Sequence, residues 1–333
     1  MDKITAKLIL VKPAILDNSK DVSSFYNKMY DDLIRDIYNL RLSVPSSLNN
    51  IQFWKLNFKY IKSPPKNLHK RKIGTLHISH YVDLENTNIT CETICGKIKK
   101  HENIIDLEIK KELLIFEFEQ ILYNIVFALN LSYGGLFNVS EGSCFYGKSA
   151  FYINNKKYKN TNFGGLPSDC MYINRLIDIN SIPFITTWNW MQNKTNFFNG
   201  RSTNRIDRTL NALTYLYDCR AYEDIFYSLM GIEALYNRGE GDIREQIENK
   251  VRCVLGDFSN IHTIIKNMYY IRSDFFHGRF RLEQNHCDEV FISKDMDKYY
   301  EAVNTALLII IATIQKMIIN NCSSIEELLE LKL

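Results

Sequence analysis

Residues 261–278, IHTIIKNMYYIRSDFFHG, determine how the second half of this chain folds. Apolar side chains recur on one helical face: Ile261, Ile265, Met268 and Phe275. This spacing predicts an amphipathic helix over 261–276, and Gly278 is expected to stop it because glycine accepts the left-handed conformation that ends many helices. The same stretch places a permanent cation, Arg272, and a titratable imidazole, His277, near one helix end.

Arg272 is expected to find a carboxylate on the preceding helix. It lies eleven residues after Ile261, and at about 100° per residue it returns almost onto the apolar face. An arginine directed towards a core needs an anionic partner. On the helix predicted over 222–236, Glu233 lies at the edge of the apolar stripe, which makes it the nearest candidate.

Arg272 and His277 are the residue types that RNA cleavage needs. A guanidinium can hold the phosphate and stabilise its growing charge, while an imidazole moves the proton of the ribose 2′-hydroxyl or of the leaving oxygen. Because RNA supplies its own nucleophile, this chemistry requires no metal. Residues five positions apart are about 140° apart on a straight helix, so the two side chains converge only if the chain turns at His277 or if a dimer joins two helix ends. A helix C-terminus also favours a protonated imidazole.

The spacing between Arg272 and His277 is a weak signal by itself. Similar spacings occur at Arg71 and His77, Arg281 and His286, and Arg279 and His286. The pair in 261–278 differs from these by its amphipathic helix and its glycine stop. The alternative interpretation is purely structural: an arginine paired with Glu233, and a histidine that closes a helix end.

Several separated segments resemble the HEPN domain, closest to its ApeA-like branch. They are Leu229–Tyr236 (LMGIEALY), Tyr270–Ser273 (YIRS) and His277–Gly278. Upstream, Trp188–Met191 (WNWM) and the helix through Ala212 and Tyr215 resemble the segment that leads into the domain in that branch. The resemblance covers roughly residues 184–325, and ApeA-like proteins also carry an N-terminal domain of similar size.

The resemblance implies a helical bundle that dimerises and brings Arg272 and His277 of both copies into one cleft. It implies a metal-independent endoribonuclease of antiviral (anti-phage abortive infection) or toxin-type defence. Candidate partners beside RNA are a regulatory protein or a phage-derived trigger, and the sequence identifies neither. Arg272 would contact the scissile phosphate, His277 would act as acid or base, and Glu233 matches the acidic position of the earlier helix. Ser273 occupies a polar position where many HEPN domains have Asn or Asp, and Asp274 could take part. The alternative is a HEPN domain kept as a non-catalytic dimerisation or RNA-binding sensor.

The chain of 333 residues is expected to form an α+β protein with two domains: a mixed α/β recognition or regulatory domain over 1–180 and an all-α HEPN helical bundle over 181–333. In the first, β-branched or alternating stretches predict strands over 4–11, 51–61 and 73–84, with helices over 24–40 and 105–131. Gly134 and Gly135 are expected to end the second of these helices, before an irregular stretch over 137–181. Beyond it, apolar periodicity predicts helices over 184–193, 204–217, 222–236, 242–255, 261–276 and 294–320.

A basic cluster between two predicted strands is a candidate RNA-binding segment. The net charge of +3 is only mildly basic, so attraction to nucleic acid must come from local clustering. The cluster consists of Lys55, Lys59, Lys62, Lys66, Lys70, Arg71 and Lys72, interleaved with aromatic residues. A solvated loop between strands explains the same residues.

The remaining patterns indicate a reducing, cytoplasmic setting without a cofactor or metal. The eight cysteines are scattered, and no apolar segment follows the basic start of the chain. His77 and His80 with Cys91 and Cys95 fit no tetrahedral zinc spacing. The apolar run over 302–319 is interrupted by polar residues and is expected to be a buried helix. Side chains expected to pack in the helical core are Trp188, Trp190, Cys219 and Cys253.

Overall fold

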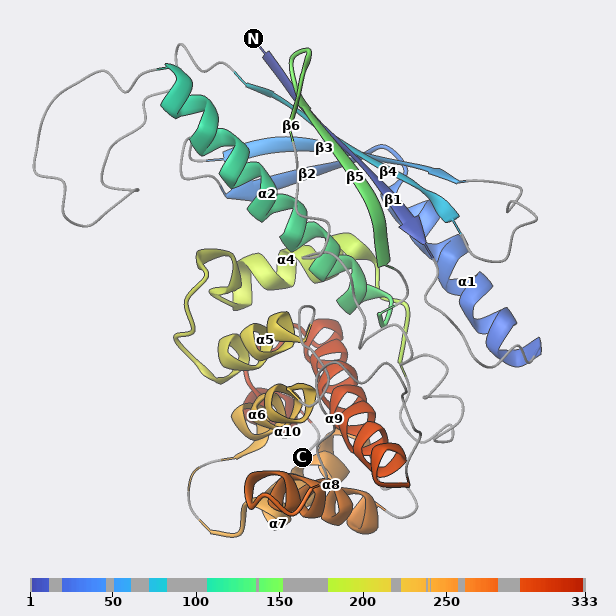
Figure 1. Ribbon diagram of the computed structural model, residues 1–333, viewed down its shortest axis with the longest axis vertical. Coiled ribbons are helices and arrows are strands. Elements are labelled where there is room, and N and C mark those ends of the chain that lie inside the picture. The colour runs from blue at the N-terminus through green and yellow to red at the C-terminus, as the bar shows by residue number, and fades with distance from the viewer. Residues whose placement is uncertain are drawn as a thin grey trace, which may run out of the picture. The chain divides into compact units, whose positions relative to one another are not determined.

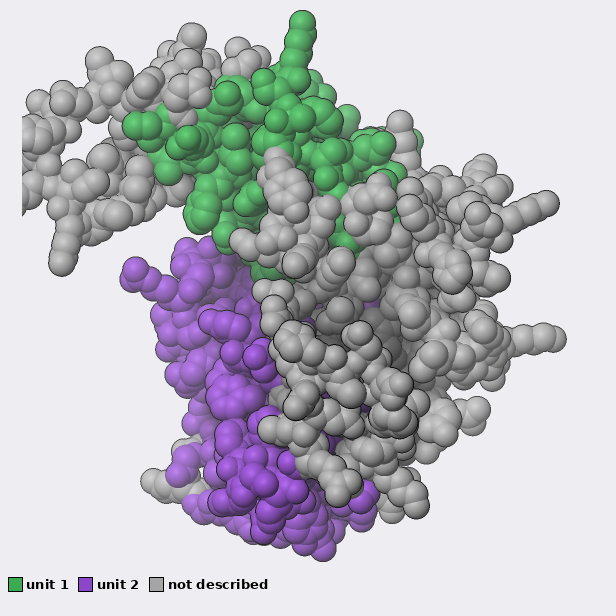
Figure 2. All heavy atoms as spheres, viewed as in Figure 1, with its two compact units in different colours: residues 1–12, 30–128, 137–159 green, residues 13–29, 129–136, 160–333 purple. Residues whose placement is uncertain are grey.

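The computed structural model describes residues 2–11, 20–45, 51–60, 72–82, 107–135, 138–151, 179–216, 223–237, 239, 241–256, 261–280 and 294–331. The chain divides into two compact units, which are described one at a time. Unit 1 comprises 1–12, 30–128 and 137–159, and unit 2 comprises 13–29, 129–136 and 160–333 (Figure 2, green and purple). The α+β class predicted from the sequence is confirmed, because an antiparallel sheet near the N-terminus precedes a helical region (Figure 1).

Unit 1 contains a 6-stranded antiparallel sheet with the strand order β2-β3-β4-β1-β5-β6. The strands are β1 (Asp2–Val11), β2 (Leu40–Pro45), β3 (Ile51–Tyr60), β4 (Lys72–Val82), β5 (Asn138–Tyr146) and β6 (Ser149–Phe151). The sequence predicted β1, β3 and β4. It missed β5, whose interior is polar and which is held by its pairing with β1, and it missed β2 and β6.

One face of the sheet forms the core of unit 1. On β1, Ile4, Ala6, Leu8 and Leu10 are buried, while Lys3 and Lys7 are exposed on the opposite face. Helix α2 (Leu107–Ser132) packs on the covered face, where the ring of Phe118 lies 6.1 Å from that of Phe151. The sheet therefore has one covered face and one face open to solvent.

Both helices of this region end where the local backbone requires it. Helix α1 (Lys20–Ile37) buries Leu33 and Ile37, and Asn39, at φ 54°, leads directly into β2, so the predicted helix over 24–40 ends earlier than expected. Helix α2 is followed by Gly134 and Gly135 at φ 61° and 78°, which confirms the predicted stop.

Unit 2 is helical. Its elements are α4 (Phe184–Lys194), the 3₁₀ turn η3 (Phe197–Asn199), α5 (Arg205–Tyr215), α6 (Asp224–Tyr236), α7 (Ile243–Leu255), α8 (Ile261–Phe276), α9 (Lys294–Ile319) and α10 (Ile325–Glu330). All the helices predicted over 184–320 are present, and α10 was not predicted. Helix α9 contacts α4, α6, α7, α8 and α10 and is the central helix of the unit (Figure 1).

The polar residues within α9 do not make it too short or too polar to span a membrane, so that part of the prediction was wrong, whereas the predicted buried helix is confirmed. Lys298–Ile319 has a mean hydropathy of 1.9 and is long and apolar enough to cross a bilayer. However, 83% of this apolar window is buried inside the protein, as expected for a core helix.

Of the expected core residues of unit 2, Cys219 lies outside the described residues, and two of the other three predictions are right. Trp188 and Trp190 are buried, and the indole of Trp190 donates to the carbonyl of Cys322 at 2.7 Å. Cys253 is exposed, so that prediction was wrong. Helix α7 buries Val251, and a residue two positions later lies about 200° around the helix from it.

Candidate functional site

Helix α8 ends in a Schellman motif. Gly278 adopts φ 67°, and its N–H donates to the carbonyl of Phe275 at 3.2 Å. The N–H of Arg279 donates to the carbonyl of Asp274 at 2.8 Å. The predicted glycine stop is therefore confirmed. His277, the residue before the glycine, follows the last helical residue and its side chain is exposed.

Arg272 on α8 pairs with Glu233 on α6, as predicted from the two helical periodicities. The Nε of Arg272 lies 3.5 Å from the Oε1 of Glu233, and the hydroxyl of Tyr269 donates to the same oxygen at 3.1 Å. The guanidinium also lies 5.8 Å from the ring centre of Tyr269 and 5.6 Å from that of Phe276. The side chain of Arg272 is 40% exposed, so it lies at the edge of the core and part of it remains accessible.

Tyr269 is held as a neutral hydrogen-bond donor. Burial of the phenol, followed by the negative charge of Glu233, raises the pKa of Tyr269 well above its usual range. The phenol therefore keeps its proton at physiological pH and orients the carboxylate that faces Arg272. We define Glu233, Tyr269 and Arg272 as the arginine cluster.

Ser273 and Asp274 form a second contact set, centred on Arg279. The Nε of Arg279 lies 3.0 Å from the Oδ1 of Asp274, and its Nη2 donates to the hydroxyl of Ser273 at 3.0 Å. These two predicted site residues thus contact Arg279 and not Arg272. In the sequence, Arg279 was noted only for its spacing to His286, so its contacts with Ser273 and Asp274 were missed.

The arginine cluster and His277 are not in contact in the part of the chain that the structure describes. Among the residues that the structure describes, no hydrogen bond or ion pair joins the side chains of Arg272 and His277. Arg272 is directed towards α6, whereas His277 lies beyond the last helical residue. A single copy therefore presents the two functional groups separately.

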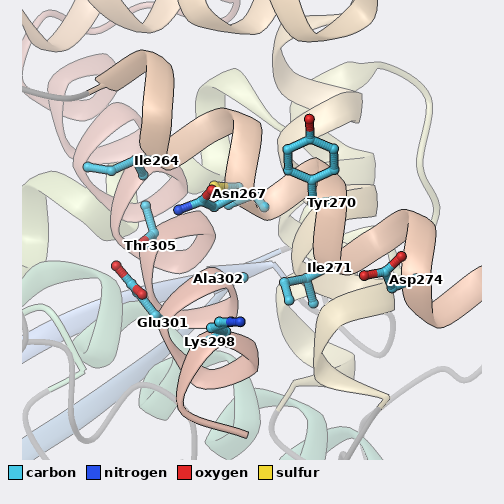
Figure 3. A pocket seen from close by; sticks show the side chains of 10 residues that line it. Ile264, Asn267, Tyr270, Ile271, Asp274, Lys298, Glu301, Ala302 and Thr305 are labelled. Atoms are coloured by element: carbon cyan, nitrogen blue, oxygen red, sulfur yellow. The ribbon is translucent and has the colours of Figure 1, made fainter. Parts of the chain in front are cut away.

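A groove of about 360 Å³ lies between α8 and α9 (Figure 3). Its polar lining comes from Asn267, Tyr270 and Asp274 on α8 and from Lys298, Glu301 and Thr305 on α9. Asp274 is thus shared between this groove and the contact with Arg279. Sequence reasoning missed the groove because the α9 residues belong to a helix expected to be core.

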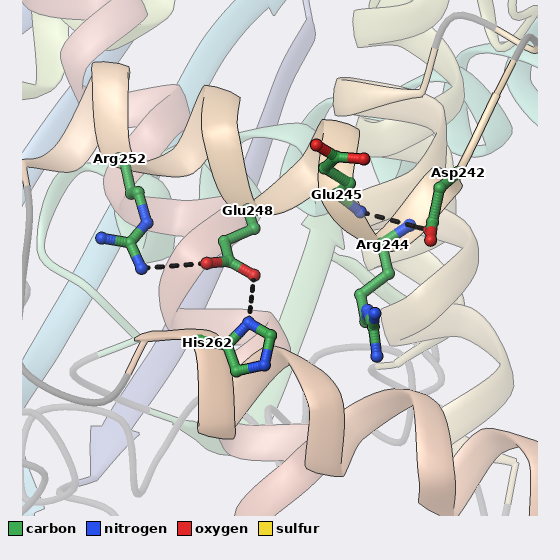
Figure 4. Close-up of polar contacts among 6 residues, drawn as sticks. All are labelled: Asp242, Arg244, Glu245, Glu248, Arg252 and His262. Carbon is green, nitrogen blue, oxygen red and sulfur yellow. Dashed lines mark hydrogen bonds and ion pairs between the residues drawn. The ribbon is translucent and has the colours of Figure 1, made fainter.

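The carboxylate of Glu248 on α7 links this helix to His262 on α8 and also binds Arg252 of its own helix (Figure 4). Glu248 lies 2.8 Å from Nδ1 of His262 and accepts from Nη2 of Arg252 at 2.9 Å. Partial burial opposes ionisation, but the hydrogen bonds from His262 and Arg252 outweigh it and lower the pKa of Glu248. No sequence spacing identifies this contact, because the histidine and the carboxylate lie fourteen positions apart on two different helices.

Only part of the basic cluster falls on described residues. Lys55 is exposed on β3, Lys59 belongs to the same strand, and Lys72 is the first residue of β4. The other candidates, Lys62, Lys66, Lys70 and Arg71, lie outside the described residues, as do Cys91 and Cys95. Within the described part of the chain, no group of three His, Cys, Asp or Glu residues is placed to hold a metal ion.

Comparison with protein-family models, curated proteins and solved structures finds nothing that matches this chain. The likeness to the HEPN domain therefore stays a prediction from the sequence motifs, and the candidate site depends on the geometry described above.

Proposed function

We propose that this chain is a metal-independent endoribonuclease of the HEPN type that acts as a homodimer. The observation that supports it is the arginine cluster: a guanidinium oriented by Glu233 and Tyr269, partly exposed, on the helix that ends directly before His277. An oriented arginine that keeps an accessible edge is suited to a phosphodiester, which it can contact through two N–H donors.

The proposed reaction is an internal transesterification. The ribose 2′-oxygen attacks the adjacent phosphorus, the bond from phosphorus to the 5′-oxygen breaks, and the products carry a 2′,3′-cyclic phosphate and a 5′-hydroxyl. His277 takes the proton of the 2′-hydroxyl or gives a proton to the leaving 5′-oxygen. Arg272 stabilises the negative charge that grows on the phosphate oxygens.

A second copy of the chain completes the site. Arg272 and His277 lie about 140° apart on a straight helix, and no contact joins them among the described residues, so we expect the partner copy to supply the second group. Phe276, whose ring lies 5.6 Å from the guanidinium of Arg272, is 53% exposed, and its ring lies 6.0 Å from that of Phe226, which is 43% exposed. Met230, four positions after Phe226 on α6, is 41% exposed. Exposed apolar side chains gathered at a site favour burial against another protein surface.

The alternative is a non-catalytic HEPN module that dimerises or binds RNA as a sensor. Two observations favour it: Arg272 already has an anionic partner, and the described residues provide no hydrogen bond that would fix the tautomer of His277. Under either alternative, we propose that the protein acts in the cytoplasm as part of a defence system. A regulatory protein or a phage-derived trigger would control it.

The test is cleavage of RNA by the purified full chain in excess EDTA. The wild-type protein should release fragments with 2′,3′-cyclic phosphate ends, and Arg272→Ala and His277→Ala should each abolish the reaction. Arg208→Ala, an exposed arginine on α5, is the matched control and should cleave at the wild-type rate. Loss of cleavage on chelation, or full activity in both site variants, would refute the proposal. Binding without cleavage by the wild-type protein would support the sensor.

A further inference from the structure

The open face of the unit 1 sheet gathers cationic and aromatic side chains from strands that are distant in sequence. The register places Arg41, Lys55, Ser79, Thr5 and Phe145 side by side in one row across β2, β3, β4, β1 and β5. In the rows on either side, Lys3 lies opposite Tyr81 and Lys7 lies opposite His77. We define Lys3, Lys7, Arg41, Lys55, Tyr81 and Phe145 as the open sheet face.

The cations of this face are available to an anionic ligand. Lys3, Lys7, Arg41 and Lys55 are exposed. Among the described residues, none of them has a carboxylate as ion-pair partner. The register places an acidic residue, Glu141, opposite Ile9, two positions beyond Lys7. Within the described side chains, the central rows therefore carry positive charge that no ion pair offsets.

The aromatic side chains of the face point to a ligand with flat rings. Tyr81 is 62% exposed and Phe145 is 38% exposed, although an antiparallel sheet usually presents polar residues to solvent. The ammonium of Lys3 lies 5.5 Å from the ring centre of Tyr81, so charge and ring are presented together. Alternating phosphates and bases of a nucleic-acid strand match such a combination.

The shape of the surface favours a single strand over a duplex. A sheet is broad and cannot enter the deep, narrow major groove of A-form RNA, whereas unpaired bases can lie on exposed aromatic rings. Lys3 and Lys7 are four residues apart on one strand, about 13 Å, so a strand that crosses the face can contact more than one cation.

We propose that the open sheet face binds single-stranded RNA, with phosphates on Lys7, Arg41 and Lys55 and bases on Tyr81 and Phe145. The choice of RNA over single-stranded DNA rests on the proposed function of α8. The binding surface itself does not, because it lies wholly within unit 1 and requires neither Arg272 nor His277.

The test measures the affinity of the full chain for labelled single-stranded oligouridine by fluorescence anisotropy over a series of salt concentrations. Arg272→Ala is present throughout, so that the RNA stays intact. Combining Lys7→Ala with Lys55→Ala should weaken binding and lower the slope of log K against log salt by about 1.4, because each lost phosphate contact in a single strand contributes about 0.7. Combining Tyr81→Ala with Phe145→Ala should weaken binding at least about fivefold with an unchanged salt slope.

Lys28→Ala, an exposed lysine on α1, is the control and should bind as the parent does. The side chains substituted on the sheet are solvent-exposed or partly exposed, and unchanged thermal unfolding verifies the fold of each variant. Equal affinity and equal salt slope in both double variants would overturn the proposal, as would preferential binding of duplex RNA or of anionic vesicles through the same lysines. If wild-type protein binds in this way but cleaves no RNA, the proposed function fails and the binding surface stands.

Discussion

Replacing Glu233 by glutamine separates the charge of the arginine cluster from its hydrogen bond. The amide oxygen of Gln can still accept from the hydroxyl of Tyr269, which lies 3.1 Å from the carboxylate in the native protein. The negative charge that faces Arg272 at 3.5 Å is lost. Glu233→Ala, in contrast, removes both interactions.

The structure sets the expected magnitudes. The side chains of Arg272 and Glu233 are 40% and 22% exposed, so their ion pair is screened by solvent and Glu233→Gln should lower the free energy of unfolding by about 0.5 kcal/mol. Glu233→Ala should lower it by about 1 kcal/mol more, because the hydroxyl of Tyr269 loses its acceptor. The effect on cleavage should be larger: a guanidinium displaced from its productive position should reduce kcat about tenfold in Glu233→Gln.

Urea unfolding of both variants, alone and combined with Arg272→Ala, measures the stability terms and the coupling between the two side chains. RNA cleavage under saturating substrate measures kcat. Two results would refute the reasoning: zero coupling between Glu233 and Arg272, or a wild-type kcat in Glu233→Gln despite a measurable coupling. The second outcome would leave Glu233 as a residue that only stabilises the fold.

Three further predictions concern the fold and the helix end. Burial opposes ionisation of Asp207, but the hydrogen bonds that its carboxylate accepts from Thr203 and Asn196 outweigh burial and lower its pKa. Its contribution to the free energy of unfolding is therefore present above about pH 4, the range of an unfolded aspartate, and is lost as pH falls through the folded pKa. Asp207→Asn should flatten the acid side of the curve of unfolding free energy against pH, and an unchanged curve would contradict this. Gly278→Ala should cost about 1 kcal/mol in chemical denaturation because φ is 67° there, and cleavage should fall with it; equal stability would show that the Schellman motif does not hold the helix end. Combining Phe226→Ser with Phe276→Ser should shift the dimer to monomer in light scattering at dilution without unfolding the chain, whereas an unchanged dimer would place the interface elsewhere.

The features of the site that could be predicted from the sequence are those set by one helix or by two periodic helices. Gly278 signals the end of α8 through its own backbone freedom, and the helical spacing of two apolar stripes indicates that Glu233 and Arg272 face each other. The first prediction needs only the conformation of one residue, and the second needs only the rotation per residue along two helices. The burial of Arg272 was overestimated from the sequence, because helical spacing shows that a residue lies at the edge of an apolar stripe but not how exposed its side chain is.

The features that could not be predicted depend on long-range pairing. Strand β5 carries polar residues in its interior, so its alternation is weak, and its pairing with β1 places it in the sheet. The contact of Arg279 with Ser273 depends on how the chain turns after Gly278. The contact of Glu248 with His262 depends on how two helices pack. The row from Arg41 to Phe145 becomes visible only when the register of the strands is known.

Mixing two inactive variants tests most directly whether the end of α8 is half of an RNA-cleaving site. Purified Arg272→Ala and His277→Ala proteins are each assayed on single-stranded RNA in EDTA, and then unfolded, mixed and refolded together so that they form mixed dimers. A composite cleft predicts that neither variant cleaves alone and that the mixture recovers part of the wild-type rate, because each mixed dimer contains one intact Arg272 opposite one intact His277. A mixture as inactive as its components, with wild-type protein refolded in parallel fully active, would contradict a site shared between two copies.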